Sequence, residues 1–314
     1  MVRRPFYVRI AWTLRDYAKR VWDNSGEDNI FFLAGGIAFN ILLAAVPFVL
    51  LLVSGLATLL NHSADETLID VTAIIDSLLP PHAETSESPV HKLLVDIIRA
   101  RGAVGVYSAV GFIWFSTRLF GSLRSVLADV FDIESDRGII QGKLFDVQIT
   151  IMATLLLVAY TGLSAYLALA TTRGVQLVER LGIRADVMGT LEYAFGRLLA
   201  FAFVATMFFA LYKFLPNRKI RSQTAWIAAL FSGVMLEIAK NVFTAYVAEF
   251  NPGSIYTGTL YALVIVVFWV YYAAMIFILG GEVGQVHELR RVRRLQRETF
   301  EDEPAITHQP SAIS

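Results

Sequence analysis

The chain contains no cysteine and few charged residues. Of its 314 residues, only 17% are Asp, Glu, Lys or Arg, and the 27 basic side chains balance the 27 acidic ones. A water-soluble domain carries about 25% charged residues, so this chain has too few for that class. The absence of cysteine excludes a disulfide-stapled secreted scaffold. The zero net charge excludes a nucleic-acid binder that depends on overall positive charge.

Motifs for catalysis and metal binding are also missing from the sequence. The chain has five histidines, and none of them has a metal-binding spacing. Walker A, nucleophile-elbow and dinucleotide-binding patterns do not occur. A cluster of four acids between residues 129 and 136 could hold Mg²⁺ in principle, but the adjacent Arg137 favours a solvated helix end. We therefore expect no enzyme, no metal and no cofactor.

Long hydrophobic runs dominate the chain, which is 56% hydrophobic. Six runs approach the roughly 20 residues that cross a hydrocarbon core of about 30 Å. They are Phe31–Leu60, a run from Ala103 that becomes basic after Phe115, Val147–Thr171, Leu191–Leu215, Thr224–Ala248 and Ile255–Gly281. Backbone groups in lipid must be hydrogen-bonded within their own segment, so each run predicts a helix. The expected fold is an all-α integral membrane protein with six transmembrane helices.

The distribution of Lys and Arg predicts the orientation. They concentrate before the first run, after the second and fourth runs, and in the tail, which places both termini in the cytoplasm. We divide the chain into a cytoplasmic amphipathic segment (1–28), a six-span membrane domain (29–288) and a basic cytoplasmic tail with a disordered end (289–314). Within the membrane domain, residues 61–102 predict a small helical cap on the extracytoplasmic side. The first run, which has no cleavage pattern before it, would itself be the targeting signal.

Polar residues on the fifth run lie where polarity is costly. A charge at a helix centre in lipid costs about 2.5–3.5 kcal/mol on insertion scales. Glu237 and Lys240 share one helix face, and Asn241 follows Glu237 by one turn. Three interpretations stay open: the two charges neutralise each other, they line a cavity for a substrate or proton, or they pair with another span.

Small residues precede these polar groups on the same helix face. Ala225, Ala229 and Gly233 lead by steps of four to Glu237 and Asn241. Small side chains let another helix approach closely. The pattern therefore predicts that Glu237 and Asn241 face protein rather than lipid.

Two other spans carry candidate polar or helix-breaking residues. Arg118 on the second run could reach the cytoplasmic interface by snorkelling, or it could point inward. Asn40 and Pro47 lie in the first run, which is too long to cross the bilayer untilted. Pro47 predicts either an ordinary kink or a broken helix beside a cavity.

The end of the sixth run combines glycines with a carboxylate. Gly280 and Gly281 allow a backbone or a ligand to come close, and we interpret Glu282 as a carboxylate solvated at the interface. A basic amphipathic extension follows, carrying Arg290, Arg291, Arg293 and Arg294. It could lie on anionic lipid headgroups or act as a simple positive-inside anchor.

Several motifs form a recognisable pattern between about Asp28 and Glu288. They are Leu33–Leu60 with Asn40 and Pro47, Ile113–Arg118, Phe209–Pro216, Trp226, Gly233, Phe243, Tyr246, Tyr256–Gly258, Trp269–Tyr271 and Leu279–Glu282. This pattern resembles the YihY/BrkB family of bacterial inner-membrane proteins, historically called ribonuclease BN. Asp129 stands where that family often has Asn. The resemblance implies a multi-pass protein of the bacterial inner membrane.

Three functions follow as hypotheses. The first is a transporter-like or lipid- and envelope-handling protein whose polar residues line a cavity. The alternative is a non-transporting scaffold for envelope proteins, in which the same residues hold helices together. A membrane enzyme or ribonuclease is the least favoured, because no catalytic constellation is visible. Membrane lipids are the expected partners, and nucleic acid is not.

Overall fold

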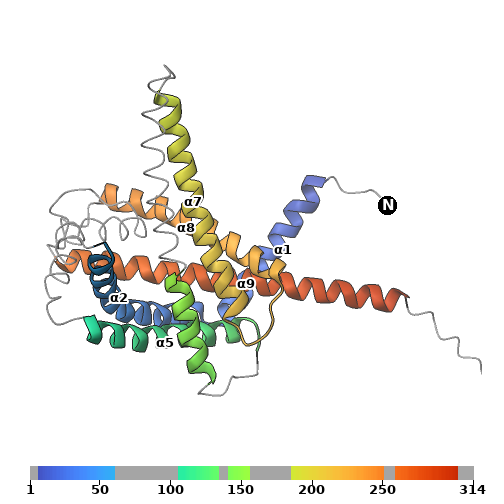
Figure 1. Cartoon of the computed structure of the whole chain (residues 1–314). Coiled ribbons are helices and arrows are strands. Elements are labelled where there is room, and N and C mark those ends of the chain that lie inside the picture. Colours follow the sequence, from blue (N-terminus) through green and yellow to red (C-terminus); the bar gives the residue numbers. More distant parts are fainter. Residues whose placement is uncertain (1–5, 61–104, 134–140, 156–184, 251–258, 303–314) are drawn as a thin grey trace, which may run out of the picture.

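The computed structural model describes residues 6–60, 105–133, 141–155, 185–250 and 259–302. These residues form helices and connecting turns and contain no strand. The helices are α1 (Phe6–Glu27), α2 (Ile30–Leu60), α5 (Gly105–Val130), a helix over residues 141–155, α7 (Ala185–Phe214), α8 (Ser222–Phe250) and α9 (Thr259–Asp302). The predicted cap at 61–102 lies outside the described residues. Figure 1 shows the arrangement.

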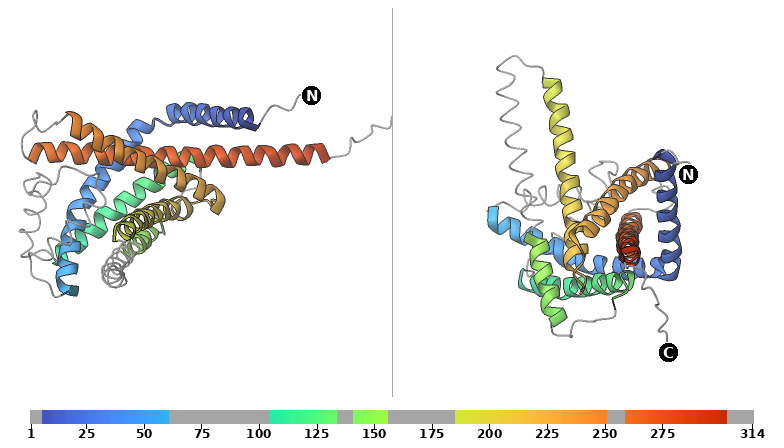
Figure 2. Two further views of the ribbon diagram at one scale, coloured as in Figure 1. Left: turned by 90° about the horizontal axis from the view of Figure 1, so that it is seen from above. Right: turned by 90° about the vertical axis from the view of Figure 1, so that its right-hand side faces the viewer.

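Helix α9 is the axis on which the other elements pack. Its 44 residues correspond to about 66 Å at ~1.5 Å per residue, which exceeds the hydrocarbon thickness. α2, α8, α5 and α1 all contact it, while α2 also pairs with α5 and α7 with α8. α1 crosses the second half of α9 and rises away from it toward the N-terminus (Figure 1 and Figure 2). The apolar sixth run and the basic extension are therefore one unbroken helix.

Four of the described helices are long and apolar enough to cross a membrane. The candidate spans are Ile30–Phe48, Gly196–Phe214, Ser222–Tyr246 and Leu263–Gln296. They correspond to the first, fourth, fifth and sixth predicted runs. The third run continues beyond residue 155, outside the described residues. The six-span count and the cytoplasmic placement of both termini stay predictions.

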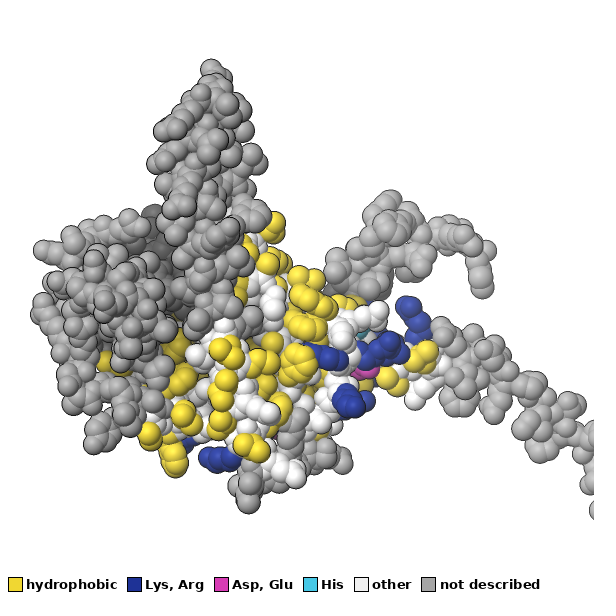
Figure 3. Space-filling view, viewed as in Figure 1, with side chains coloured by type: hydrophobic (Ala, Val, Ile, Leu, Met, Phe, Trp, Pro, Cys, Tyr) yellow, Lys and Arg dark blue, Asp and Glu magenta, His cyan; other side chains and the backbone are white. Residues whose placement is uncertain are grey.

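The molecule has both a buried apolar core and an exposed apolar surface, as expected for a membrane protein. Leu127, Tyr212 and Ile278 belong to a core drawn from α5, α7 and α9. Large apolar side chains such as Phe32 and Trp114 remain exposed. Hydrophobic side chains cover much of the face in Figure 3, whereas basic ones gather around the end of α9. Such extended apolar surface is typical of contact with lipid.

Candidate functional site

The charged group on α8 is an ion cluster between two helices. Glu237 Oε1 lies 2.9 Å from a guanidinium nitrogen of Arg197 on α7, and Glu237 Oε2 lies 2.5 Å from Lys240 Nζ. The Glu237 side chain is 29% exposed. Two of the three interpretations therefore apply at the same time, because Glu237 pairs both with Lys240 and with another span. The role of this cluster in a cavity stays a prediction.

The small residues in the first half of α8 pack against protein. Ala225, Ala229 and Gly233 are buried, and Phe201 of α7 lies against Gly233. Farther along, Asn241 is exposed, and its side-chain amide donates to the carbonyl oxygen of Glu237 at 2.7 Å. The prediction that Asn241 faces protein was wrong, because the contact of this half of α8 with α9 is made by Phe243, whose ring lies near that of Trp269, and Asn241 lies on an exposed face.

The remaining predicted polar residues lie on the other helix pair, α2 and α5. Asn40 donates to the carbonyl oxygen of Gly36 at 2.9 Å, a bond within its own helix. Pro47 lies inside α2, which continues unbroken to Leu60, and it packs opposite Gly111 of α5. Arg118 is exposed on α5. The five predicted polar residues are thus divided between two helix pairs.

Glycines on α9 permit very close helix approach. A Cβ atom on Gly280 would lie 1.8 Å from Ser232 Oγ and 2.4 Å from the Tyr212 hydroxyl oxygen. A Cβ atom on Gly281 would lie 3.1 Å from Val130 of α5. The predicted packing role of these glycines therefore has a direct steric basis.

Glu282 is the buried carboxylate of this region. Its side chain is 0% exposed, and neither carboxylate oxygen has a hydrogen-bond partner. Asn24 and Asp28 of the first helix and its turn, and Asp132 after α5, are the polar groups around it. The prediction of a solvated carboxylate was wrong, because α1, α5 and α8 pack around this part of α9 and exclude water.

A chain of hydrogen bonds runs past Glu282 and joins three elements. The Asn24 side-chain amide donates to Gln285 Oε1 at 2.8 Å, and Gln285 Nε2 donates to Asp132 Oδ2 at 2.8 Å. One turn farther along the same face of α9, the Thr224 hydroxyl of α8 donates to Glu288 at 2.6 Å. Sequence reasoning missed Asn24, Gln285 and Thr224, because single amides and hydroxyls carry no motif.

Two turns with unusual backbone conformation flank the buried carboxylate. Asn29 and Asp132 both have φ of 49°. Asp132 ends α5 in a Schellman arrangement, in which the amide of Ile133 bonds to Ala128 and that of Asp132 to Asp129. Asn and Asp tolerate this left-handed conformation better than other side chains.

The basic extension of α9 is partly used within the chain. Arg290 pairs with Asp16 of α1, and its guanidinium lies 3.8 Å from the centre of the Tyr17 ring. Arg291 lies 3.6 Å from Glu288, whereas Arg293 and Arg294 are exposed. Binding of lipid headgroups by this extension stays a prediction. Arg293 and Arg294 are the residues whose exposed side chains could provide it.

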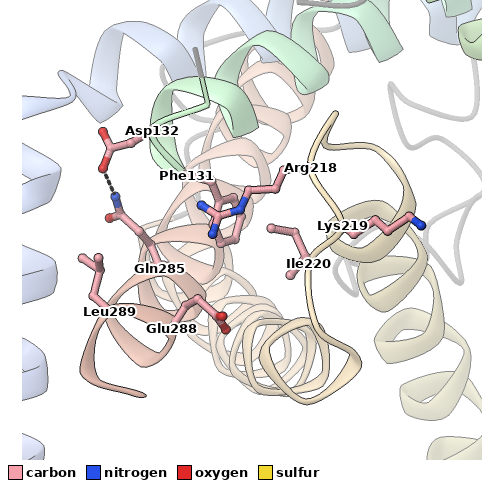
Figure 4. A pocket seen from close by; sticks show the side chains of 8 residues that line it. All are labelled: Phe131, Asp132, Arg218, Lys219, Ile220, Gln285, Glu288 and Leu289. Atoms are coloured by element: carbon pink, nitrogen blue, oxygen red, sulfur yellow. Dashed lines mark hydrogen bonds between the residues drawn. The ribbon is translucent and has the colours of Figure 1, made fainter. Parts of the chain in front are cut away.

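A pocket of about 120 Å³ opens next to this polar chain. Its walls come from the end of α5, the turn between α7 and α8, and α9 (Figure 4). The lining residues are Phe131, Asp132, Arg218, Lys219, Ile220, Gln285, Glu288 and Leu289. Among the described residues, no group of three or more His, Cys, Asp or Glu has a geometry suited to a metal ion.

A comparison with protein families shows to which family this chain belongs. The family model "Virulence factor BrkB" matches residues 21–304. The chain belongs to the BrkB family. Its BrkB match includes every residue of the pocket and the buried Glu282. The resemblance seen in the sequence is confirmed, and with it the description of the chain as a membrane protein.

Relatives in other bacteria support the assignment over most of the length. A UPF0761 membrane protein of Alteromonas mediterranea is 24% identical over 94% of this chain and 96% of its own. One of Chlorobium chlorochromatii is 25% identical over 82% of this chain, which spans only 56% of that relative. One of Vibrio vulnificus is 24% identical over 82% of this chain and 77% of its own. No solved structure matches the chain.

Proposed function

We propose that this BrkB-family protein is a transporter-like or lipid-handling protein that recognises an anionic group in the pocket beside α9. The observation that carries the proposal is the placement of Arg218 and Lys219 in the wall of a pocket of about 120 Å³. Both side chains are exposed. Arg218 directs its guanidinium among the lining side chains, which include the acids Asp132 and Glu288, whereas Lys219 extends away from them at the pocket edge (Figure 4). Guanidinium and ammonium groups are the usual protein partners of phosphate.

The position of the pocket relative to the spans fits a lipid headgroup. The candidate span on α7 ends at Phe214, and the one on α8 begins at Ser222. Arg218 and Lys219 lie in the short turn between them, at the depth where a hydrocarbon core gives way to headgroups. The N-terminus of α8 follows directly at Ser222, and the dipole of a helix favours anions near that end.

The size of the pocket limits what it can take. Small-molecule sites usually have volumes of about 300–1,000 Å³. A pocket of about 120 Å³ suits a phosphate-sized group rather than a whole lipid. We infer that acyl chains would stay outside, against the exposed apolar helix faces. The proposal includes no chemical step, and it places this face of the molecule on the cytoplasmic side of the bacterial inner membrane.

The span-five charges have a supporting role in this proposal. Arg197 and Lys240 already neutralise Glu237, so that carboxylate has little spare charge for a substrate. The same observation favours the second candidate function, a non-transporting scaffold for envelope proteins. In a scaffold, ion clusters of this kind would serve only to hold α7 against α8.

The test is native mass spectrometry of the full-length protein released from nanodiscs of phosphatidylethanolamine and phosphatidylglycerol. Wild type is compared with a double variant, Arg218→Gln with Lys219→Gln. The matched control is Arg15→Gln with Lys19→Gln, which removes two exposed charges on α1, outside the pocket. We expect wild type and the control to retain phosphatidylglycerol and the pocket variant to lose it.

Two results would count against this function. Equal retention by the pocket variant and wild type would show that the pocket does not recognise the headgroup. No retention by any of the three proteins would favour the scaffold. A wash with inorganic phosphate that displaces the lipid from wild type, but has no effect on the remaining lipid of the pocket variant, would assign recognition to the phosphate group.

A further inference from the structure

The carboxyl group of Glu282 is enclosed without a partner. Its side chain is 0% exposed on the longest apolar helix, and both oxygens lack a hydrogen bond. Buried polar groups are nearly always paired, so such an exception calls for an explanation. Ionisable side chains within membrane helices are rare and usually mark a site of function.

Charged neighbours make the ionised form still less favourable. Among the described residues, Asp28 of the α1–α2 turn and Asp132 after α5 act on Glu282, and both are acidic. The nearest basic groups along α9 are already engaged, since His287 contacts the Tyr17 hydroxyl and Arg290 pairs with Asp16. On the turn before α8, Arg218 lies in the wall of the adjacent pocket with Gln285.

We propose that Glu282 is a proton-binding site and that its proton holds α1 against α9. A neutral carboxyl can stay in this enclosed position, whereas an unpaired carboxylate facing two other acids cannot. Loss of the proton must therefore bring in water or separate Glu282 from one of its acidic neighbours. Asp28 lies in the turn at the end of α1, so release of α1 from α9 would admit water between Asp28 and Glu282.

Contacts between α1 and α9 are largely polar and easily replaced by water. They include Asn24 with Gln285, Tyr17 with His287, and Asp16 with Arg290. Water can satisfy each of these groups when α1 leaves, so separation costs little compared with the loss of apolar packing. The turn at Asn29, between α1 and α2, is the point about which α1 would swing.

As a consequence, α1 acts as a cover that separates from α9 as the pH rises. In the protonated state α1 lies on α9 and closes the region around Glu282. In the ionised state α1 separates, and water reaches Glu282 and the chain of amides beside it. This proposal rests on the buried carboxyl alone and stands whatever ligand the neighbouring pocket takes.

The lack of native cysteine allows a direct distance measurement. Ala18 on α1 and Gln296 on α9 are both exposed, so Ala18→Cys with Gln296→Cys gives a clean pair for spin labels. The full-length protein in nanodiscs is measured by electron–electron double resonance across a pH series. We expect one short distance at low pH and a second, longer one that grows as pH rises.

Three variants separate the proposal from a general pH effect. Glu282→Gln, which keeps the shape without the proton, should show only the short distance at every pH. Glu288→Gln, the same change at a hydrogen-bonded carboxylate on the same helix, should behave as wild type. Asp28→Asn removes one repelling charge and should shift the transition to lower pH.

An infrared titration of wild type keeps the proposal testable if Glu282→Gln does not fold. The carbonyl stretch of a protonated carboxyl group should disappear over the same pH range in which the longer distance grows. A wild-type distance that does not change with pH would overturn the proposal. A pH transition retained in Glu282→Gln, or unmoved in Asp28→Asn, would overturn it as well.

Discussion

The hydroxyl of Tyr212 lies 2.8 Å from Ser232 Oγ and donates to the carbonyl oxygen of Phe277 at 2.6 Å. This one side chain therefore joins α7, α8 and α9. The rings of Tyr212 and Phe277 are stacked, with centroids 5.1 Å apart. The junction lies beside Gly280, whose missing side chain leaves the space that the two hydroxyl groups occupy.

Replacing Gly280 should disturb this junction. In Gly280→Ala the new methyl carbon would lie 1.8 Å from Ser232 Oγ, so helices must move apart. We expect a loss of about 1–3 kcal/mol in the free energy of unfolding, the usual cost of overpacking. Unfolding by titration with sodium dodecyl sulfate would measure it. Gly36→Ala is the control, because nothing lies within 4 Å of a Cβ there. Equal stability of the two variants would contradict this view of the junction.

Removing the Tyr212 hydroxyl should also destabilise this junction, by a similar amount. Tyr212→Phe leaves a fully buried carbonyl oxygen and the Ser232 hydroxyl without this partner. The expected cost is about 1–3 kcal/mol, typical of an unsatisfied buried group. Tyr271→Phe provides the comparison, since its hydroxyl makes an exposed bond of 3.3 Å to Phe31 and should cost little. The prediction fails if both variants unfold at the same detergent concentration.

The ion pair between Arg124 and Asp146 should be the most sensitive one. Its atoms lie 2.8 Å apart, the Asp146 side chain is 3% exposed, and Arg124 also bonds to the carbonyl oxygen of Gly142. Arg124→Gln leaves a buried carboxylate without its cation, for which about 3–5 kcal/mol is typical. Arg197→Gln should cost less than about 1 kcal/mol, because that side chain is 53% exposed and Lys240 still pairs with Glu237. The reverse order in the same unfolding titration would refute this ranking.

The cluster on α8 should respond unequally to loss of its acid and its bases. Glu237→Gln removes the anion that Arg197 and Lys240 share, whereas Lys240→Gln leaves the pair with Arg197 intact. We therefore expect Glu237→Gln to be the less stable variant. Both should retain phosphatidylglycerol to the same extent as wild type in the native mass spectrometry experiment proposed above. Loss of lipid from Glu237→Gln alone would instead indicate that the substrate site lies on α8.

Much of the helix arrangement follows from local sequence. Runs of about 20 residues or more with few charges predicted α2, α7, α8 and α9, because such lengths suit a hydrocarbon core and backbone groups in lipid must be bonded within the helix. Steps of three and four correctly placed Glu237 beside Lys240. Gly280 and Gly281 correctly indicated a close approach, although the sequence did not show which helices are the partners. These features depend only on neighbours along the chain.

The packing partners depend on the tertiary structure. Helical periodicity shows which residues share a face, but it does not show which helix that face meets. Only the fold brought Arg197 to Glu237, Asp16 to Arg290, and Arg218 to the wall shared with Gln285. Glu282 illustrates the difference most clearly. Its position at the end of an apolar run favoured contact with water, whereas α1, α5 and α8 enclose it. Burial is a sum over all surrounding elements, so local sequence determined the helix that carries Glu282 and only tertiary packing decided that its carboxyl group is hidden.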